Sequence, residues 1–232
     1  MQRSWLGLLE WPMRRMLRHY ATARYLYDLV ETLDDQATDR ASILKASFYD
    51  ALRAAPLTYI DIGARGGLNP SLDQFREILK VVMFEPDPTE AARLQQGLRS
   101  TGTVVIPAAV SDRSGRRVVH LTRKRGNSSM LLPRGHSIGL TAIDGEGLSR
   151  YHVDTTIEVA TTRIDESLAE YDLSAEILKI DTQGSEWPIL QGLGDHRPYV
   201  IVAECATTEV YEGQITIWKI GAHLESLGYF PA

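Results

Sequence analysis

A short glycine-rich segment, Asp61-Ile-Gly-Ala-Arg-Gly-Gly67, is the feature that most constrains how this chain can fold. It follows a run of β-forming residues over 57–60 and precedes Asn69-Pro70, a pair suited to start a helix. Glycines let the backbone approach a ligand closely, and a following helix presents unpaired N–H groups at its N-terminus. The segment therefore predicts a ligand-binding turn at the end of a first strand.

The composition indicates an ordinary globular protein. The 232 residues suffice for one large α/β domain, placed at 56–232, and a helical segment over 1–55. A net charge of −5 argues against a nucleic-acid partner. The single cysteine cannot form an internal disulfide, and neither a signal-peptide core nor an apolar run of membrane-spanning length occurs. We therefore expect a cytoplasmic protein.

The N-terminal segment has a helical pattern, with a second helix expected over 40–54. Its first thirty residues mix tryptophans and leucines with arginines, the composition of a basic amphipathic helix. Such a helix can lie on a membrane surface, or it can cover the main domain or a dimer partner, which is the commoner use. Peripheral membrane contact and dimer contact through residues 1–30 both stay open.

Short apolar runs alternate with helical patterns along the rest of the chain. The runs predict strands at 57–60, 81–84, 104–106, 177–180 and 199–203. An apolar stripe from Leu72 to Leu79 predicts one intervening helix, and Asp87, Pro88 and Glu90 predict a capping box at the start of the next. This alternation is typical of a doubly wound, mostly parallel α/β sheet with helices on both faces.

Acidic residues follow the ends of all these strands. Ligands of such sheets bind beyond the C-terminal strand ends, so the acids should gather around one site. They are Asp61, Glu85, Asp112, Asp181 and Glu204.

The βα alternation lapses between residues 112 and 166, where we expect a β-hairpin insertion that covers the site, placed between the third and fourth strands of the sheet. Two strands are predicted here, at 116–122 and 152–161. The insertion also has a basic run without acidic residues, whose members are Arg113, Arg116, Arg117, Arg123, Lys124, Arg125 and Arg134. The run either recognises an anionic acceptor or forms a solvated face of the hairpin.

The glycine turn and Glu85 together suit a nucleoside ligand, because a carboxylate can accept hydrogen bonds from both ribose hydroxyls. A dinucleotide site would place a glycine where Arg65 stands, and the chain lacks a P-loop. S-adenosylmethionine is the alternative, since its cationic, phosphate-free tail suits a motif that opens with the carboxylate of Asp61.

Several blocks of the sequence resemble the FkbM-type S-adenosylmethionine-dependent methyltransferases, from about Tyr59 to Gly228. The blocks are Tyr59-Ile-Asp-Ile-Gly-Ala-Arg-Gly-Gly67, Phe84-Glu-Pro-Asp-Pro88, Ala109-Val-Ser-Asp112, Asn127-Ser-Ser129, Thr162-Arg-Ile-Asp165, Leu178-Lys-Ile-Asp-Thr-Gln-Gly-Ser-Glu186 and Ala203-Glu204. The resemblance implies a Rossmann-like class I methyltransferase fold and methyl transfer to a hydroxyl of a sugar, a glycan or a polyketide-type molecule. It also leaves open that the chain is truncated at its C-terminus.

The resemblance implies cofactor contacts from Asp61, Gly63, Gly67 and Glu85, with Asp112 as a weaker candidate at the adenine end. Arg65 stands where the family usually has Asn, and we expect it to point away from the site or to pair with an acid.

Asp181 is the leading candidate for the base that removes the acceptor's proton, with Glu204 second. Histidines of the insertion are alternative bases: His120, His136 and His152. Arg123, Arg125 and His136 are the candidate acceptor-binding residues. No Cys/His spacing suggests zinc, and we expect no metal.

Two other functions remain open. One is a nicotinamide-dependent oxidoreductase on a similar fold, and the other is a non-catalytic, cofactor-binding adaptor.

Overall fold

The computed structural model describes residues 48–98, 102–135, 137 and 147–231. Most of the expected N-terminal helical segment, with its membrane or dimer contact, lies outside the described residues. Residues 48–54 are helical, in line with the helix expected over 40–54.

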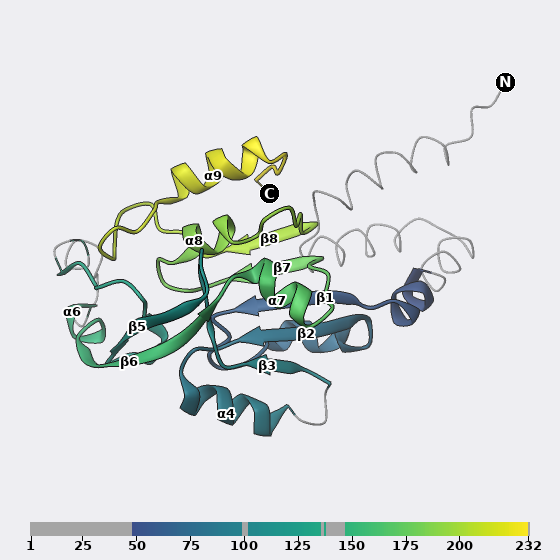
Figure 1. Ribbon diagram of the computed structural model, residues 1–232, viewed down its shortest axis with the longest axis horizontal. Coiled ribbons are helices and arrows are strands. Elements are labelled where there is room, and N and C mark those ends of the chain that lie inside the picture. The colour runs from purple at the N-terminus through teal and green to yellow at the C-terminus, as the bar shows by residue number, and fades with distance from the viewer. Residues whose placement is uncertain (1–47, 99–101, 136, 138–146, 232) are drawn as a thin grey trace.

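The centre of the molecule is a five-stranded, all-parallel sheet with the strand order β3-β2-β1-β7-β8 (Figure 1). The strands are β1 (Leu57–Ile62), β2 (Leu79–Phe84), β3 (Val104–Ile106), β7 (Ile177–Ile180) and β8 (Val200–Ala203). This arrangement confirms the predicted α/β sheet, because each short apolar run forms one of its parallel strands.

Helices cover both faces of this sheet. On one face, the side chains of Ile60, Ile62 and Ile180 pack against α7 (Ile164–Glu170), α8 (Glu186–Gln191) and α9 (Ile217–Ser226). On the other, Tyr59 and Met83 pack against η1 (Pro70–Ile78) and α4 (Pro88–Gly97). The alternation of side chains along each strand thus supplies two separate cores.

Two local predictions were wrong. The segment after the glycine turn forms a 3-10 helix, η1, and Leu79 begins β2 instead of ending a helix. Asp87 is the N-cap of α4 as predicted and accepts a hydrogen bond from the Thr89 N–H, but Glu90 does not complete a capping box. Instead, the Glu90 carboxylate accepts a hydrogen bond from the Gly66 N–H at 2.8 Å and forms an ion pair with Arg93. The glycine turn lies close to the start of α4, so the Gly66 N–H takes the carboxylate that would otherwise complete the capping box.

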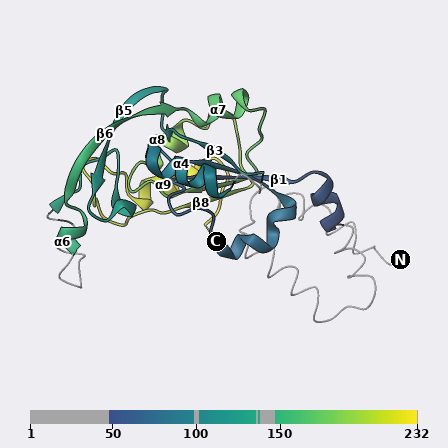
Figure 2. The same cartoon turned by 90° about the horizontal axis from the view of Figure 1, so that it is seen from below.

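The insertion forms a second sheet with the order β4-β6-β5. The predicted hairpin strands are β5 (Gly115–Thr122) and β6 (Val153–Thr162), which pair antiparallel, and the two-residue strand β4 (Ala109–Val110) adds a parallel edge. Between β5 and β6 lie the short helices η3 (Arg125–Asn127) and α6 (Gly147–Arg150). Figure 2 shows β5 and β6 curving away from the parallel sheet.

The C-terminal ends of β1 and β2 point toward this second sheet (Figure 1). The inner side chains of the second sheet include Val119, Leu121 and Val159. A site at the C-terminal strand ends is therefore enclosed on one side by the insertion. Within the described parts of the chain, no helix is long and apolar enough to cross a membrane.

Candidate functional site

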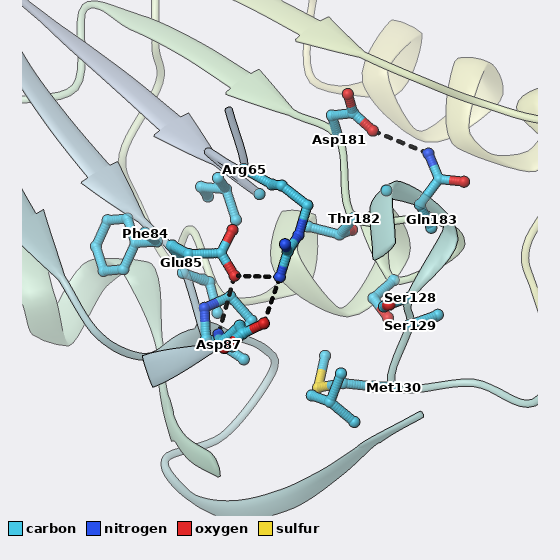
Figure 3. Close-up of a pocket in the computed structure, with 18 of the residues that line it drawn as sticks. Arg65, Phe84, Glu85, Asp87, Ser128, Ser129, Met130, Asp181, Thr182 and Gln183 are labelled. Carbon is cyan, nitrogen blue, oxygen red and sulfur yellow. Dashed lines mark hydrogen bonds and ion pairs between the residues drawn. The ribbon is translucent and has the colours of Figure 1, made fainter. Parts of the chain in front are cut away.

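A pocket lies where the parallel sheet meets the second sheet (Figure 3). Its wall on the side of the parallel sheet comes from the ends of β1, β2 and β7, including Gly63, Glu85 and Asp181. The opposite wall comes from β4, β5 and the loop after η3. The residues of that wall are Ala109, Val110, Val119, Leu121, Arg125, Gly126, Ser128, Ser129 and Met130. The pocket thus lies at the end of the sheet where parallel α/β folds bind ligands.

The glycine turn uses its own backbone donors internally. The N–H groups of Gly63 and Ala64 both donate to the Phe84 carbonyl, at 3.0 and 3.1 Å. The Gly67 N–H donates to the Ala64 carbonyl, and the Gly66 N–H donates to Glu90. These four donors are therefore committed and do not form a phosphate cradle.

Gly63 is required by close packing of two loops. Its φ is +84°, and a Cβ at this position would lie 1.9 Å from the Asp181 carbonyl oxygen. The Asp181 N–H also donates to the Ile62 carbonyl. The turn after β1 and the loop after β7 are consequently held against each other, and both line the pocket.

Arg65 lines the pocket, but its charge is paired. Its guanidinium lies 2.6 Å from the Asp87 carboxylate and 3.8 Å from that of Glu85. Figure 3 shows it reaching from the glycine turn to both acids. The expectation that Arg65 pairs with an acid is confirmed, and the pairing leaves the neighbouring pocket without an unbalanced cation.

Glu85 is the acid that follows β2. Its Oε1 accepts the Asp87 N–H at 2.9 Å, and burial raises the pKa of its carboxyl group. The side chain lines the pocket next to Phe84, with Ala108 across from it. Glu85 therefore lies where the sequence predicted a ribose-binding carboxylate.

Asp61 is not among the residues that line the pocket. It is opposite Lys179 in the register of β1 and β7, and the Lys179 ammonium lies 2.8 Å from its carboxylate. Only 2% of Asp61 is exposed, and burial raises the pKa of its carboxyl group although Lys179 opposes the change. The second neighbour of Lys179 is the Asp181 carboxylate, at 3.8 Å. Asp61 thus acts on the pocket through Lys179.

Asp181 lines the pocket and forms a pair with Glu204. The Gln183 side-chain amide donates to both carboxylates, at 3.0 Å to Asp181 and 3.3 Å to Glu204. A hydrogen bond to Asp181, together with burial and the Asp181 charge, raises the pKa of Glu204 to about 7. The structure therefore brings both predicted catalytic acids to one amide, with Asp181 at the pocket and Glu204 outside its lining. Such a pair can exchange a proton near neutral pH.

The loop that presents Asp181 is fixed by Glu186. Its Oε1 accepts hydrogen bonds from the N–H groups of Thr182 and Gly184 and from the Thr182 hydroxyl. The residue is 1% exposed, and burial raises the pKa of its carboxyl group. Oε2 has no hydrogen-bond partner among the described residues. Glu186 therefore holds the backbone that positions the acid pair.

Further predicted site residues, besides Asp61, lie away from the pocket or outside the described chain. Asp112 pairs with Arg113 and Arg117, and neither it nor Gly67 lines the pocket. His136 lies outside the described residues. The other two candidate histidines, His120 and His152, do not line the pocket.

The basic run is largely neutralised. Arg125 lines the pocket, whereas Arg123 does not, and both pair with Asp154. Further pairs to acids outside the run are Arg113 and Arg117 with Asp112, Arg116 with Glu158 and Arg134 with Glu209. The run is therefore a poor general anion-binding surface, with Arg125 as its member at the pocket.

Sequence reasoning gave no role to several residues that line the pocket. Ser128, Ser129 and Met130 reach it from the insertion, and Thr182 and Gln183 reach it from the loop after β7. The Asn127-Ser128-Ser129 block was the only signal for the first group. Among the described residues no three His, Cys, Asp or Glu side chains cluster as a metal site would require.

Comparisons with known proteins agree with this geometry. A family profile described as "Methyltransferase FkbM domain" matches residues 61–231, which include the end of β1, the glycine turn and the loop after β7. Neither the curated proteins nor the solved structures include a match to the chain. The match covers most of the sequence and every element that lines the pocket, so the chain belongs to the FkbM methyltransferase family.

Proposed function

We propose that this methyltransferase uses S-adenosylmethionine to methylate a hydroxyl group of a sugar, a glycan or a polyketide-type small molecule. The observation that carries the proposal is that Glu85 and Asp181 line one pocket from strands on either side of β1, with Glu204 joined to Asp181 through the Gln183 amide. This arrangement offers a nucleoside contact and a proton acceptor in a single cavity.

The pocket suits a phosphate-free nucleoside. A dinucleotide needs free backbone donors or cations for its diphosphate, and here the turn donors are committed and Arg65 is held by Asp87. These features disfavour a nicotinamide dinucleotide and favour a sulfonium cofactor.

Residues of the pocket can be assigned to parts of S-adenosylmethionine. Glu85 Oε1 accepts the hydrogen bond from the Asp87 N–H, so we assign the other carboxylate oxygen, Oε2, to the ribose hydroxyls. Phe84, Ala108 and Val110 form an apolar wall suited to the adenine, in place of the more distant Asp112. The carboxylate of Asp181 is suited to lie near the sulfonium charge.

When bound, the cofactor supplies an electrophilic methyl group whose departure leaves a neutral thioether. The chain must hold the acceptor oxygen in line and take up its proton as the new O–C bond forms. Asp181 lies at the pocket surface and accepts this proton, and the neighbouring Glu204 carboxyl, whose pKa is raised to about 7, completes the acid pair. Ser128, Ser129 and Arg125 on the facing wall are available to orient the acceptor.

Isothermal titration of the chain with S-adenosylmethionine and, separately, with NAD tests the cofactor. We expect saturable binding of the first only, and tighter binding of NAD would reject the proposal. Incubation with methyl-labelled S-adenosylmethionine and a panel of mono- and oligosaccharides, followed by cell-extract fractions, tests the acceptor. The label should be resistant to the base treatment that cleaves methyl esters, because an alkyl ether is stable to base.

A further inference from the structure

The backbone at Gln183 has an unusual conformation that the surrounding contacts impose. Its φ is +58°, in the left-handed region that residues with a Cβ seldom adopt. The N–H groups on either side of it, from Thr182 and Gly184, both donate to Glu186. Several hydrogen bonds of this loop therefore hold the Gln183 side chain in one place.

The orientation of the Gln183 amide is also fixed. The single hydrogen of the Tyr211 hydroxyl is shared between two acceptors, the Asn127 carbonyl at 2.9 Å and Gln183 Oε1 at 3.2 Å. Tyr211 is 2% exposed and packs against Tyr151. A flipped amide would turn its oxygen toward two carboxylates, which is electrostatically unfavourable. The NH₂ group therefore faces Asp181, as Figure 3 shows, and also donates to Glu204.

We propose that Gln183 is a positioning residue that holds the carboxylates of Asp181 and Glu204 next to each other through its amide NH₂ group, with Tyr211 fixing the direction of that amide. The inference rests on the proposed function only in taking Asp181 as the base. Gln183 itself has no titrating group and transfers no proton.

The position of this amide matters because two neighbouring carboxylates repel each other once both are ionised. The amide NH₂ donates hydrogen bonds to both carboxylates. These bonds favour the ionised forms of the two acids and oppose the effect of their repulsion. In the doubly ionised state, Asp181 can accept the acceptor's proton, and the resulting singly protonated pair is stabilised by the bond between the two acids. Gln183 thus keeps this state accessible near neutral pH.

Charges and titratable groups from each neighbouring element face the pair. They are Asp61 on β1, Lys179 on β7, Glu186 on α8, Tyr151 before β6, Cys205 after β8 and Tyr211. Lys179 is the only cation among them and already pairs with Asp61. The Gln183 amide therefore donates hydrogen bonds to both carboxylates without adding a charge.

The test is a carboxyl-carbon NMR titration of the ligand-free protein, with the Glu204 signal assigned by its loss in Glu204→Gln. In wild type the signal should titrate near pH 7. Gln183→Met keeps the length of the side chain and removes both donors, so the midpoint should move about one pH unit higher. Tyr211→Phe keeps Gln183 but releases the amide, and should move the midpoint in the same direction by less.

Gln74→Met is the matched control, because Gln74 is exposed on η1 and its amide donates only to the Ser71 carbonyl. It should titrate as wild type does. A Gln183→Met midpoint equal to that of wild type would overturn the inference. Should Gln183→Met fail to fold, an unshifted midpoint in Tyr211→Phe would overturn it as well.

The rate of methyl transfer as a function of pH provides the second measurement. The acid limb of kcat should move to higher pH in Gln183→Met, with partial recovery of the rate above pH 8. A purely structural defect would lower the rate at all pH values alike. Wild-type protein that neither binds S-adenosylmethionine nor transfers methyl would reject the proposed function while leaving the titration result valid, so the two failures are distinguishable.

Discussion

At the scale of single residues, two aspartates at the ends of neighbouring strands have different surroundings. Asp61 is 2% exposed and is bound by Lys179, whereas the side chain of Asp181 is 35% exposed and lines the pocket. Lys179 lies between them, nearer to Asp61. Asp61 therefore holds the lysine and limits how strongly it neutralises Asp181, which keeps Asp181 available as a proton acceptor.

Asp181→Asn should reduce kcat by about 10²- to 10⁴-fold, because the amide cannot accept the proton of the acceptor hydroxyl. Binding of S-adenosylmethionine should weaken by less than roughly tenfold, since Glu85 and the apolar wall are unchanged. Single-turnover kinetics and calorimetry measure the two effects. Asp195→Asn, on an exposed loop, is the control. A variant that binds cofactor and still turns over at the wild-type rate would exclude Asp181 as the base.

The charge of the acid pair should also affect the affinity for the cofactor. S-adenosylhomocysteine lacks the positive sulfur but shares the rest of the molecule, so the ratio of the two Kd values isolates the sulfonium. As Glu204 ionises around pH 7, preference for S-adenosylmethionine should rise by roughly three- to tenfold between pH 6 and 8. Calorimetry at both pH values measures the ratio, and Glu204→Gln should make it independent of pH.

At the scale of elements, the sequence predicts strands better than it predicts what surrounds them. The five apolar runs match β1, β2, β3, β7 and β8 within two residues, because a strand buried on both faces requires such a run. The helix α7 and the strand β4 were not predicted, since both are short and depend on packing against distant segments.

The same contrast applies to the site. Glu85 and Asp181 could be placed at the pocket from strand ends alone. Ser128 and Ser129 could not, because the direction in which the insertion folds back depends on contacts between the two sheets. Gln183 carried no pattern that distinguishes a positioning residue from a turn residue.

The glycine turn allows a matched pair of substitutions. Gly63 and Gly66 both have positive φ, but only at Gly63 would a Cβ meet backbone, whereas nothing lies within 4 Å at Gly66. Gly66→Ala should cost roughly 1–2 kcal/mol of unfolding free energy from the backbone conformation alone. Gly63→Ala should cost roughly 3–5 kcal/mol, because the loop after β7 must also move.

Urea denaturation measures both values, and calorimetry should show S-adenosylmethionine binding retained in Gly66→Ala and weakened at least about tenfold in Gly63→Ala. Equal effects of the two substitutions would mean that contact between the loops does not shape the site.

The insertion offers a second comparison, between two arginines that share Asp154. Arg125 lines the pocket and Arg123 does not. If the insertion recognises an acidic acceptor, Arg125→Ala should raise KM by about tenfold or more, while Arg123→Ala leaves KM within about twofold. Steady-state kinetics with the acceptor found by methyl labelling measures this. An unchanged KM in Arg125→Ala would favour a neutral acceptor.

At the scale of the whole molecule, the site joins segments that are far apart in the sequence. Its walls come from residues 62–65, 84–87, 108–130 and 181–185, and the parallel sheet brings three of these four together. The fourth belongs to the second sheet, whose apolar inner side chains face the pocket. Formation of the pocket on folding therefore buries carboxylates near apolar groups. The protonation of these carboxylates then affects the stability of the fold.

This link should make stability depend on pH in a defined direction. Burial raises the folded-state pKa of Asp61, Glu85 and Glu186, and that of Glu204 rises to about 7 from its ordinary 4.5. The unfolded chain releases these protons at lower pH, so each group stabilises the fold at acid pH and loses that contribution as pH rises through its folded pKa. Glu90 acts oppositely, because its folded pKa of about 2 gives stability above pH 4.5 that is lost in stronger acid.

The unfolding temperature should therefore rise as pH falls from 8 toward 5, and should decrease below about pH 4. Differential scanning calorimetry across this range measures the curve. Glu204→Gln should reduce the rise between pH 8 and 5 by about 2–4 °C, because it removes the group that titrates near 7. Glu225→Gln, an exposed glutamate on α9, should leave the curve unchanged. A Glu204→Gln curve that parallels wild type across pH 5 to 8 would mean that Glu204 titrates alike in the folded and unfolded chain, and that the acid pair is not formed in solution.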